Sequence, residues 1–143
     1  MPPDNTELLR RWFDATARRD VGTLLEIASP EIEYVPIMAV LEGRVYRGHD
    51  GVKQWLAEIF EHWEIFTPIG EEFHERGDTV IALGCWHARG KASGAQLDNE
   101  PATWVVEFRD GRMTRLQTYT SRTDAFEALG LSKSDELRRR YQS

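Results

Sequence analysis

Two side chains in this sequence have the chemistry to hold or move a proton beside a small ligand, Tyr34 and His74. The phenol of Tyr34 can orient a carbonyl or hydroxyl oxygen, or act as a weak acid with a reference pKa of about 10. Tyr34 fits equally well as a pocket-edge tyrosine bonded to backbone or water. The imidazole of His74 titrates near neutral pH, which suits acid–base catalysis. We predict these two residues as the catalytic pair, with Tyr34 as the orienting group.

The alternation of side chains along a strand decides whether His74 reaches a pocket. Its neighbour Phe73 competes for the inward face, and a shift of one residue exchanges the two side chains. The alternative interpretation is a histidine that faces solvent, flanked by Glu72 and Glu75.

Carboxylates are missing from the sheet face where an acid–base site would need them. Trp104, Val106 and Phe108 share one strand face, which we take as the inner face because they are large and apolar. Glu107 points the other way, and it is the only carboxylate within the predicted strands 79–89, 103–109 and 113–120. The inner face of the central sheet is therefore expected to lack a carboxylic acid or base.

The residue spacings argue against a metal site and against a phosphate-binding loop. The four histidines are spread over different predicted elements, and Cys85 is the only cysteine, so no zinc or iron ligand pattern forms. The run Gly90–Gly94 lacks the lysine placement and the following helix of a phosphate-binding loop. We predict neither a metal nor a cofactor.

Four helices and a run of strands must position these side chains. Asp4 starts a helix, Asp20 starts a second, Asp50 is predicted to cap the longest one, and Ser121 starts a short one that ends at Gly130. The longest helix carries one continuous apolar stripe, consisting of Val52, Trp55, Leu56, Ile59, Phe60 and Trp63. Residues 31–36 form a strand, residues 37–43 a loop or short hairpin, and strand signals dominate from Pro68 onward.

This order of helices followed by antiparallel strands predicts an α+β domain. A long amphipathic helix across a curved antiparallel sheet encloses a cone-shaped cavity. Its predicted lining is mostly aromatic and consists of Trp12, Tyr34, Tyr46, Trp55, Ile59, Trp63, Trp86, Trp104, Leu116 and Thr118.

Several turn and cap motifs resemble the SnoaL-like branch of the nuclear-transport-factor-2-like superfamily. They are Trp12-Phe13-Asp14 with Arg19-Asp20, Tyr46 to Val52, Gly77 to Val80, Gly90 to Gly94, Phe108 to Arg112 and Ala125 to Leu131. The likeness covers residues 5–131 and implies a cystatin-like α+β barrel, commonly a homodimer. We therefore expect one SnoaL-like domain over residues 1–131 and a polar C-terminal tail over residues 132–143.

The resemblance does not carry a known mechanism with it. Ketosteroid isomerase, a relative, uses a tyrosine on its first helix, an aspartate base near the end of its first strand and a protonated aspartic acid on a later strand. Trp12, Tyr34 and Trp104 stand at those places here, and none of them matches. The Asp-Arg-Asp arrangement of limonene epoxide hydrolase has no counterpart either.

Charge and hydropathy limit the classes of partner and the cellular location that the sequence allows. A formal net charge of −6 without a basic stripe argues against nucleic acid. The longest apolar stretch, residues 35–41, is far shorter than the roughly 20 residues that span a membrane. The first residues do not resemble a secretory signal, so we expect a cytoplasmic protein. Strand 79–89 is apolar on both faces, which predicts a homodimer through the outer sheet face.

Together these features predict a protein with a pocket for a small apolar, oxygen-bearing ligand. An acid–base enzyme of the isomerase, cyclase or dehydratase type would need no cofactor for such chemistry. A non-catalytic ligand binder and a protein-interaction module of the same fold are the alternatives, and the sequence leaves all three open.

Overall fold

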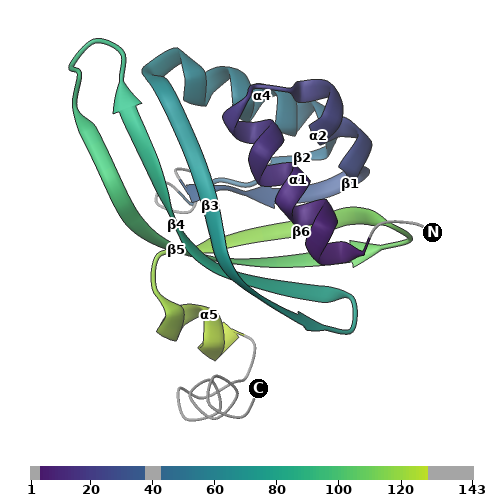
Figure 1. Ribbon diagram of the computed structural model, residues 1–143. Coiled ribbons are helices and arrows are strands. Elements are labelled where there is room, and N and C mark those ends of the chain that lie inside the picture. Colours follow the sequence, from purple (N-terminus) through teal and green to yellow (C-terminus); the bar gives the residue numbers. More distant parts are fainter. Residues whose placement is uncertain (1–3, 38–42, 129–143) are drawn as a thin grey trace.

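The computed structural model describes residues 4–37 and 43–128, and it has the predicted α+β architecture (Figure 1). The helices are α1 (Asn5–Ala17), α2 (Val21–Ile27), α4 (Gly48–His62) and α5 (Arg122–Ala128). The strands are β1 (Ala28–Val35), β2 (Tyr46–Arg47), β3 (Trp63–Arg76), β4 (Thr79–Gly90), β5 (Gln96–Arg109) and β6 (Arg112–Tyr119). The expected tail 132–143, the end of the last helix at Gly130 and most of the loop 37–43 lie outside the described residues.

The strands form one six-stranded curved sheet in the order β2-β1-β6-β5-β4-β3. Neighbouring strands are antiparallel, except that β1 runs parallel to β6. Figure 1 shows α1, α2 and α4 together on one side of this sheet and α5 on the other. The predicted α+β class is confirmed, and the inner core lies between the three helices and the sheet.

Three of the four predicted N-terminal helix caps are present in the structure. The side chain of Asp4 accepts a hydrogen bond from the Glu7 backbone N–H at 2.7 Å, and Asp20 and Ser121 cap α2 and α5 in the same way. The prediction for Asp50 is wrong, because α4 begins at Gly48 and Asp50 lies within its first turn. A carboxylate in the first turn still stabilises the helix through its dipole.

The C-terminal end of α4 also differs from the prediction. The apolar stripe continues to Trp63, but the helix ends at His62 and Trp63 is the first residue of β3. No turn residue separates the two elements, so the sequence pattern alone extends the helix by one residue.

A β-bulge in β3 shapes the sheet beside the core. Gly70 pairs with Gly84 and Glu72 pairs with Leu83, so Glu71 is an extra residue opposite β4. A Cβ atom on Gly84 would lie 1.9 Å from the carbonyl oxygen of Ile69, so only glycine allows the backbones to approach this closely. The bulge resets which side chains of β3 point inward.

The outer face of the sheet is less open than the sequence suggests. Ile81 and Leu83 point away from the inner core, yet they are only 2% and 1% exposed within the single chain. Helix α5 lies on that side of the sheet, with Ala125 fully buried (Figure 1). The covering that the homodimer prediction assigns to a second copy is thus not required by these two side chains. No described helix is long and apolar enough to cross a membrane.

Candidate functional site

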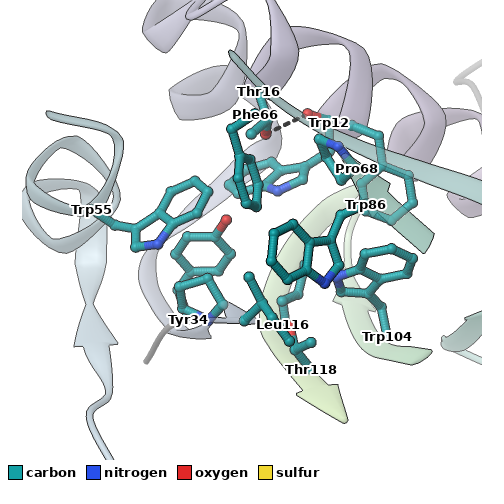
Figure 2. A pocket seen from close by; sticks show the side chains of 13 residues that line it. Trp12, Thr16, Tyr34, Trp55, Phe66, Pro68, Trp86, Trp104, Leu116 and Thr118 are labelled. Carbon is teal, nitrogen blue, oxygen red and sulfur yellow. Dashed lines mark hydrogen bonds between the residues drawn. The ribbon is translucent and has the colours of Figure 1, made fainter. Parts of the chain in front are cut away.

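A small cavity lies between the helices and the inner face of the sheet (Figure 2). Its volume is about 20 Å³, which is enough for a single water molecule. The side chains around it come from α1, β1 and the two residues that follow it, α4, and strands β3 to β6, and most are aromatic or aliphatic. They belong to Trp12, Phe13, Thr16, Tyr34, Pro36, Ile37, Trp55, Phe66, Pro68, Trp86, Trp104, Leu116 and Thr118.

Successive aromatic contacts hold the wall of the cavity. The ring of Tyr34 lies 5.4 Å from that of Trp12 and 5.2 Å from that of Trp55, edge to face in both cases. Trp55 meets Phe66 edge to face at 5.8 Å, and Phe66 stacks on Trp86 at 5.6 Å. Contacts of this kind contribute about 0.5–1.5 kcal/mol each beyond burial, so the wall is well ordered without a ligand.

The hydroxyl of Tyr34 stays protonated in this environment. Tyr34 is 3% exposed, and burial raises the pKa of its phenol far above the ordinary value. A hydrogen bond with the Trp12 side chain opposes this rise, and the nearby Tyr46 adds slightly to it. Tyr34 can therefore donate a hydrogen bond to a ligand, but it does not readily give up its proton as an acid.

Two buried polar atoms in the cavity wall have no hydrogen-bond partner among the described residues. They are the indole Nε1 of Trp55 and the hydroxyl Oγ1 of Thr118. Trp55 is 3% exposed and Thr118 is completely buried. By contrast, Thr16 in the same wall donates its hydroxyl hydrogen to the Trp12 carbonyl oxygen at 2.8 Å. Leaving a buried polar group unpaired costs about 1–3 kcal/mol, so each such atom calls for a partner such as a water molecule or a ligand.

The wall carries no charged side chain among the described residues. It therefore has polar groups that can orient a ligand and no carboxylate or imidazole that could remove a proton. No group of three or more histidine, cysteine, aspartate or glutamate side chains in the described ranges is placed to hold a metal ion.

Seven of the predicted lining residues surround this cavity: Trp12, Tyr34, Trp55, Trp86, Trp104, Leu116 and Thr118. Three others are placed elsewhere. The hydroxyl of Tyr46 donates to Glu58 Oε2 at 2.5 Å, Ile59 lies on α4 and is buried in the core, and Trp63 is half-buried at the start of β3. Tyr46 and Ile59 belong to the core without bordering the cavity.

His74 does not border the cavity. Its Nε2 atom lies 3.0 Å from Glu72 Oε1, and its side chain is 32% exposed. Phe73 takes the inner face instead, where Arg10 lies over its ring at 4.7 Å. The bulge at Glu71 is the physical reason, because it shifts the alternation of β3 by one residue. The solvent-facing alternative describes this arrangement, and we do not carry His74 forward as an acid–base group.

Sequence reasoning missed six residues of the wall, which are Phe13, Thr16, Pro36, Ile37, Phe66 and Pro68. Thr16 had a usable signal, since it lies four residues after Trp12 on the same helix face. Phe66 and Pro68 lie two residues apart on β3 and so share a face of the strand. The sequence did not indicate this, because the apolar stripe of α4 runs directly into the first residues of β3.

Known proteins resemble the chain over most of its length. Residues 9–116 match the model of the SnoaL-like domain. An uncharacterized protein of Mycobacterium tuberculosis is 30% identical over 125 residues, which cover 85% of this chain and 92% of that protein. TerC, co-crystallised with polyporic acid, is 26% identical with a TM-score of 0.71 and covers 87% of this chain and 96% of TerC. A Catenulispora acidiphila protein with a ketosteroid isomerase-like fold, in complex with trimethylamine, shares 19% identity and a TM-score of 0.72 over 90% of this chain and 96% of that one.

Proposed function

Because this chain belongs to the SnoaL-like domain family, we propose that it binds a small, apolar, oxygen-bearing molecule in the cavity between its helices and sheet. One observation carries the proposal. The cavity is walled by aromatic rings, yet Trp55 Nε1 and Thr118 Oγ1 in that wall have no hydrogen-bond partner in the described part of the chain. A ligand that offers them hydrogen-bond partners would recover stability that the empty protein lacks.

The ligand must enlarge the cavity when it enters. About 20 Å³ holds one water molecule, whereas drug-sized ligands occupy pockets of roughly 300–1,000 Å³. The stacked rings of Phe66 and Trp86 are where we propose that the wall moves to make room. TerC supports this part of the proposal, since it is a structural relative that was crystallised with polyporic acid.

We assign Tyr34 the role of the orienting hydroxyl. Its proton is retained by burial, so it can polarise a ligand carbonyl by donating a hydrogen bond. For an isomerase, cyclase or dehydratase reaction, the base would have to come from the substrate or from outside the described wall, because that wall holds no titratable base. Binding without turnover is therefore the better supported form of this function.

A protein-interaction module is the second candidate, and one observation favours it. The cavity is nearly filled, while a shallow groove along α2 and α4 has a mostly apolar lining, in which Val21 and Ala57 are exposed. Val21, Leu56, Ala57 and Phe60 line this groove, and Arg19 lies over the Phe60 ring at 4.2 Å. A protein that uses this groove would have no need for a ligand in the cavity.

Calorimetric titration with 1-tetralone, a neutral aromatic ketone, separates the two candidates. We expect saturable binding to the wild type and at least tenfold weaker binding to Thr16→Ile, whose extra methyl group fills the cavity. Thr103→Ile is the matched control, because Thr103 is as buried as Thr16 but is not part of the cavity wall. No binding to the wild type, or equal effects of both variants, would favour the interaction module.

Tyr34→Phe tests the orienting role within the same assay. Removal of the hydroxyl should weaken 1-tetralone binding several-fold, since one hydrogen bond contributes about 0.5–1.5 kcal/mol. If binding and any turnover are unchanged, the role assigned to Tyr34 is wrong. The homodimer through the outer sheet face and the cytoplasmic location stay predictions, and sedimentation at micromolar concentration measures the first of them.

A further inference from the structure

The two unpaired polar atoms come from different elements and do not pair with each other. Trp55 belongs to α4 and Thr118 to β6, and Figure 2 shows Trp55 at the left of the cluster of lining side chains and Thr118 at its lower edge. Each atom is buried and each residue borders the cavity. A ligand that satisfies both must therefore present polar atoms at two separated positions.

The indole nitrogen of Trp55 restricts what stands opposite it. An indole N–H can only donate a hydrogen bond, so its partner must be an acceptor such as a carbonyl or ether oxygen. The ring is held edge to face against Tyr34 at 89° and against Phe66 at 81°. The direction of the N–H bond is thus fixed before a ligand arrives.

The hydroxyl of Thr118 is the second polar position. Thr118 pairs with Trp104 in the β5–β6 ladder, which fixes its backbone. Its carbonyl oxygen already accepts a hydrogen bond from the Gln117 side chain at 3.1 Å, whereas its hydroxyl has no partner within residues 4–37 and 43–128. A threonine hydroxyl can donate or accept, so this position takes a carbonyl, ether or hydroxyl oxygen.

The surroundings exclude a charged ligand. No cation or carboxylate lines the described wall, so an ion that enters would lose its hydration without gaining a counter-charge. The raised pKa of the Tyr34 phenol has the same cause, since burial there penalises the charged form.

We infer that Trp55 and Thr118 are the specificity-determining residues of this cavity and select an uncharged ligand with acceptor oxygens at two separated positions. This inference rests on the proposed binding function and adds the charge and the hydrogen-bond pattern of the ligand class to it.

Four probes of one shape test the inference by calorimetric titration: tetralin, 1-tetralone, tetralin-1,4-dione and tetralin-1-carboxylate. The wild type should bind 1-tetralone about tenfold more tightly than tetralin, the effect of one satisfied polar group, and the dione about tenfold more tightly than 1-tetralone. It should bind the carboxylate more weakly than tetralin. Trp55→Phe or Thr118→Val, each of which removes one of the two positions, should bring the ratio of dione to 1-tetralone affinity towards one.

Two matched controls separate hydrogen bonding from shape. Trp86→Phe removes the same volume from the wall, but the Trp86 nitrogen is not among the unpaired atoms, so both affinities should fall together. Thr103→Val makes the same exchange in a buried threonine that does not border the cavity, and should leave the ratio unchanged. If Trp55→Phe fails to fold, the nearly isosteric Thr118→Val decides the question.

The failures are distinguishable. Binding of 1-tetralone and the dione with equal affinity, or with a ratio that neither Trp55→Phe nor Thr118→Val alters, overturns this inference and leaves the binding function standing. Tighter binding of the carboxylate than of 1-tetralone overturns it as well. Absence of binding by all four probes overturns the proposed function, and the inference with it.

Discussion

Replacement of Thr118 by valine should stabilise the ligand-free protein, whereas most substitutions of a fully buried residue destabilise it. The hydroxyl of Thr118 is completely buried and has no partner in the described chain, a situation that costs about 1–3 kcal/mol. Valine has nearly the same shape and replaces the hydroxyl by a methyl group that suits an apolar wall. The variant therefore gains what the hydroxyl costs.

The lower end of that range is the better expectation. The cavity of about 20 Å³ has room for one water molecule, which would satisfy part of the hydroxyl in solution. We therefore expect the free energy of unfolding to rise by about 1 kcal/mol. For a domain of 143 residues this corresponds to a rise in melting temperature of about 3 °C.

Urea denaturation measures this change, with far-ultraviolet circular dichroism and tryptophan fluorescence as two probes of the same transition. Thr103→Val is the control, because Thr103 is equally buried on the adjacent strand but its hydroxyl is not among the unpaired atoms. It should show no gain. A loss of stability in Thr118→Val, or the same change in both variants, would show that the Thr118 hydroxyl has a partner and would refute the reasoning.

Two further predictions concern the frame around the cavity. Gly84→Ala should lower the free energy of unfolding by about 3 kcal/mol, because the new Cβ would lie 1.9 Å from the Ile69 carbonyl oxygen. Gly22→Ala is the control, since its Cβ would lie 3.7 Å from Asp20 Oδ1, and it should cost no stability. Urea denaturation compares the two variants. The pKa of Glu58 is lowered from its ordinary value of 4.5, chiefly by the hydrogen bond from the Tyr46 hydroxyl. The stabilisation from this hydrogen bond is therefore present above pH 4.5 and is lost as the pH falls through the lowered pKa. Tyr46→Phe should make the melting temperature depend less on pH in this acid range, and an unchanged dependence would contradict the assignment.

The fold could be predicted because its signals are local. The alternation of Trp104, Val106 and Phe108 marks the inner face of β5, and all three are buried in the inner core. The caps at Asp4 and Asp20 place two helix starts, since a short polar side chain before an apolar run has few other uses. The SnoaL-like resemblance depends on turns and caps of this kind, and the family match over residues 9–116 confirms it.

The site could be predicted only in part, because its details depend on contacts between distant segments. That Trp12, Trp55 and Trp104 border one space follows from periodicity, and the structure brings them together. The volume of that space does not follow, since it depends on how the rings interlock. Whether a buried hydroxyl such as that of Thr118 has a partner depends on neighbours from other strands. Which face of β3 carries His74 depends on a β-bulge that no single residue of the sequence indicates.

That bulge also shows how little change separates this wall from a different chemistry. Regular pairing of the same residues beyond Gly70, with the extra residue moved into the turn at Gly77, would place Glu71 opposite Leu83 and Glu72 opposite Ala82. Glu72 would then occupy the position of Phe73, on the side of the sheet where Phe13 meets the cavity. Such a shift would bring a carboxylate to the inner face without altering any codon of the strand, so an acid–base group can arise in this scaffold by a change of register alone.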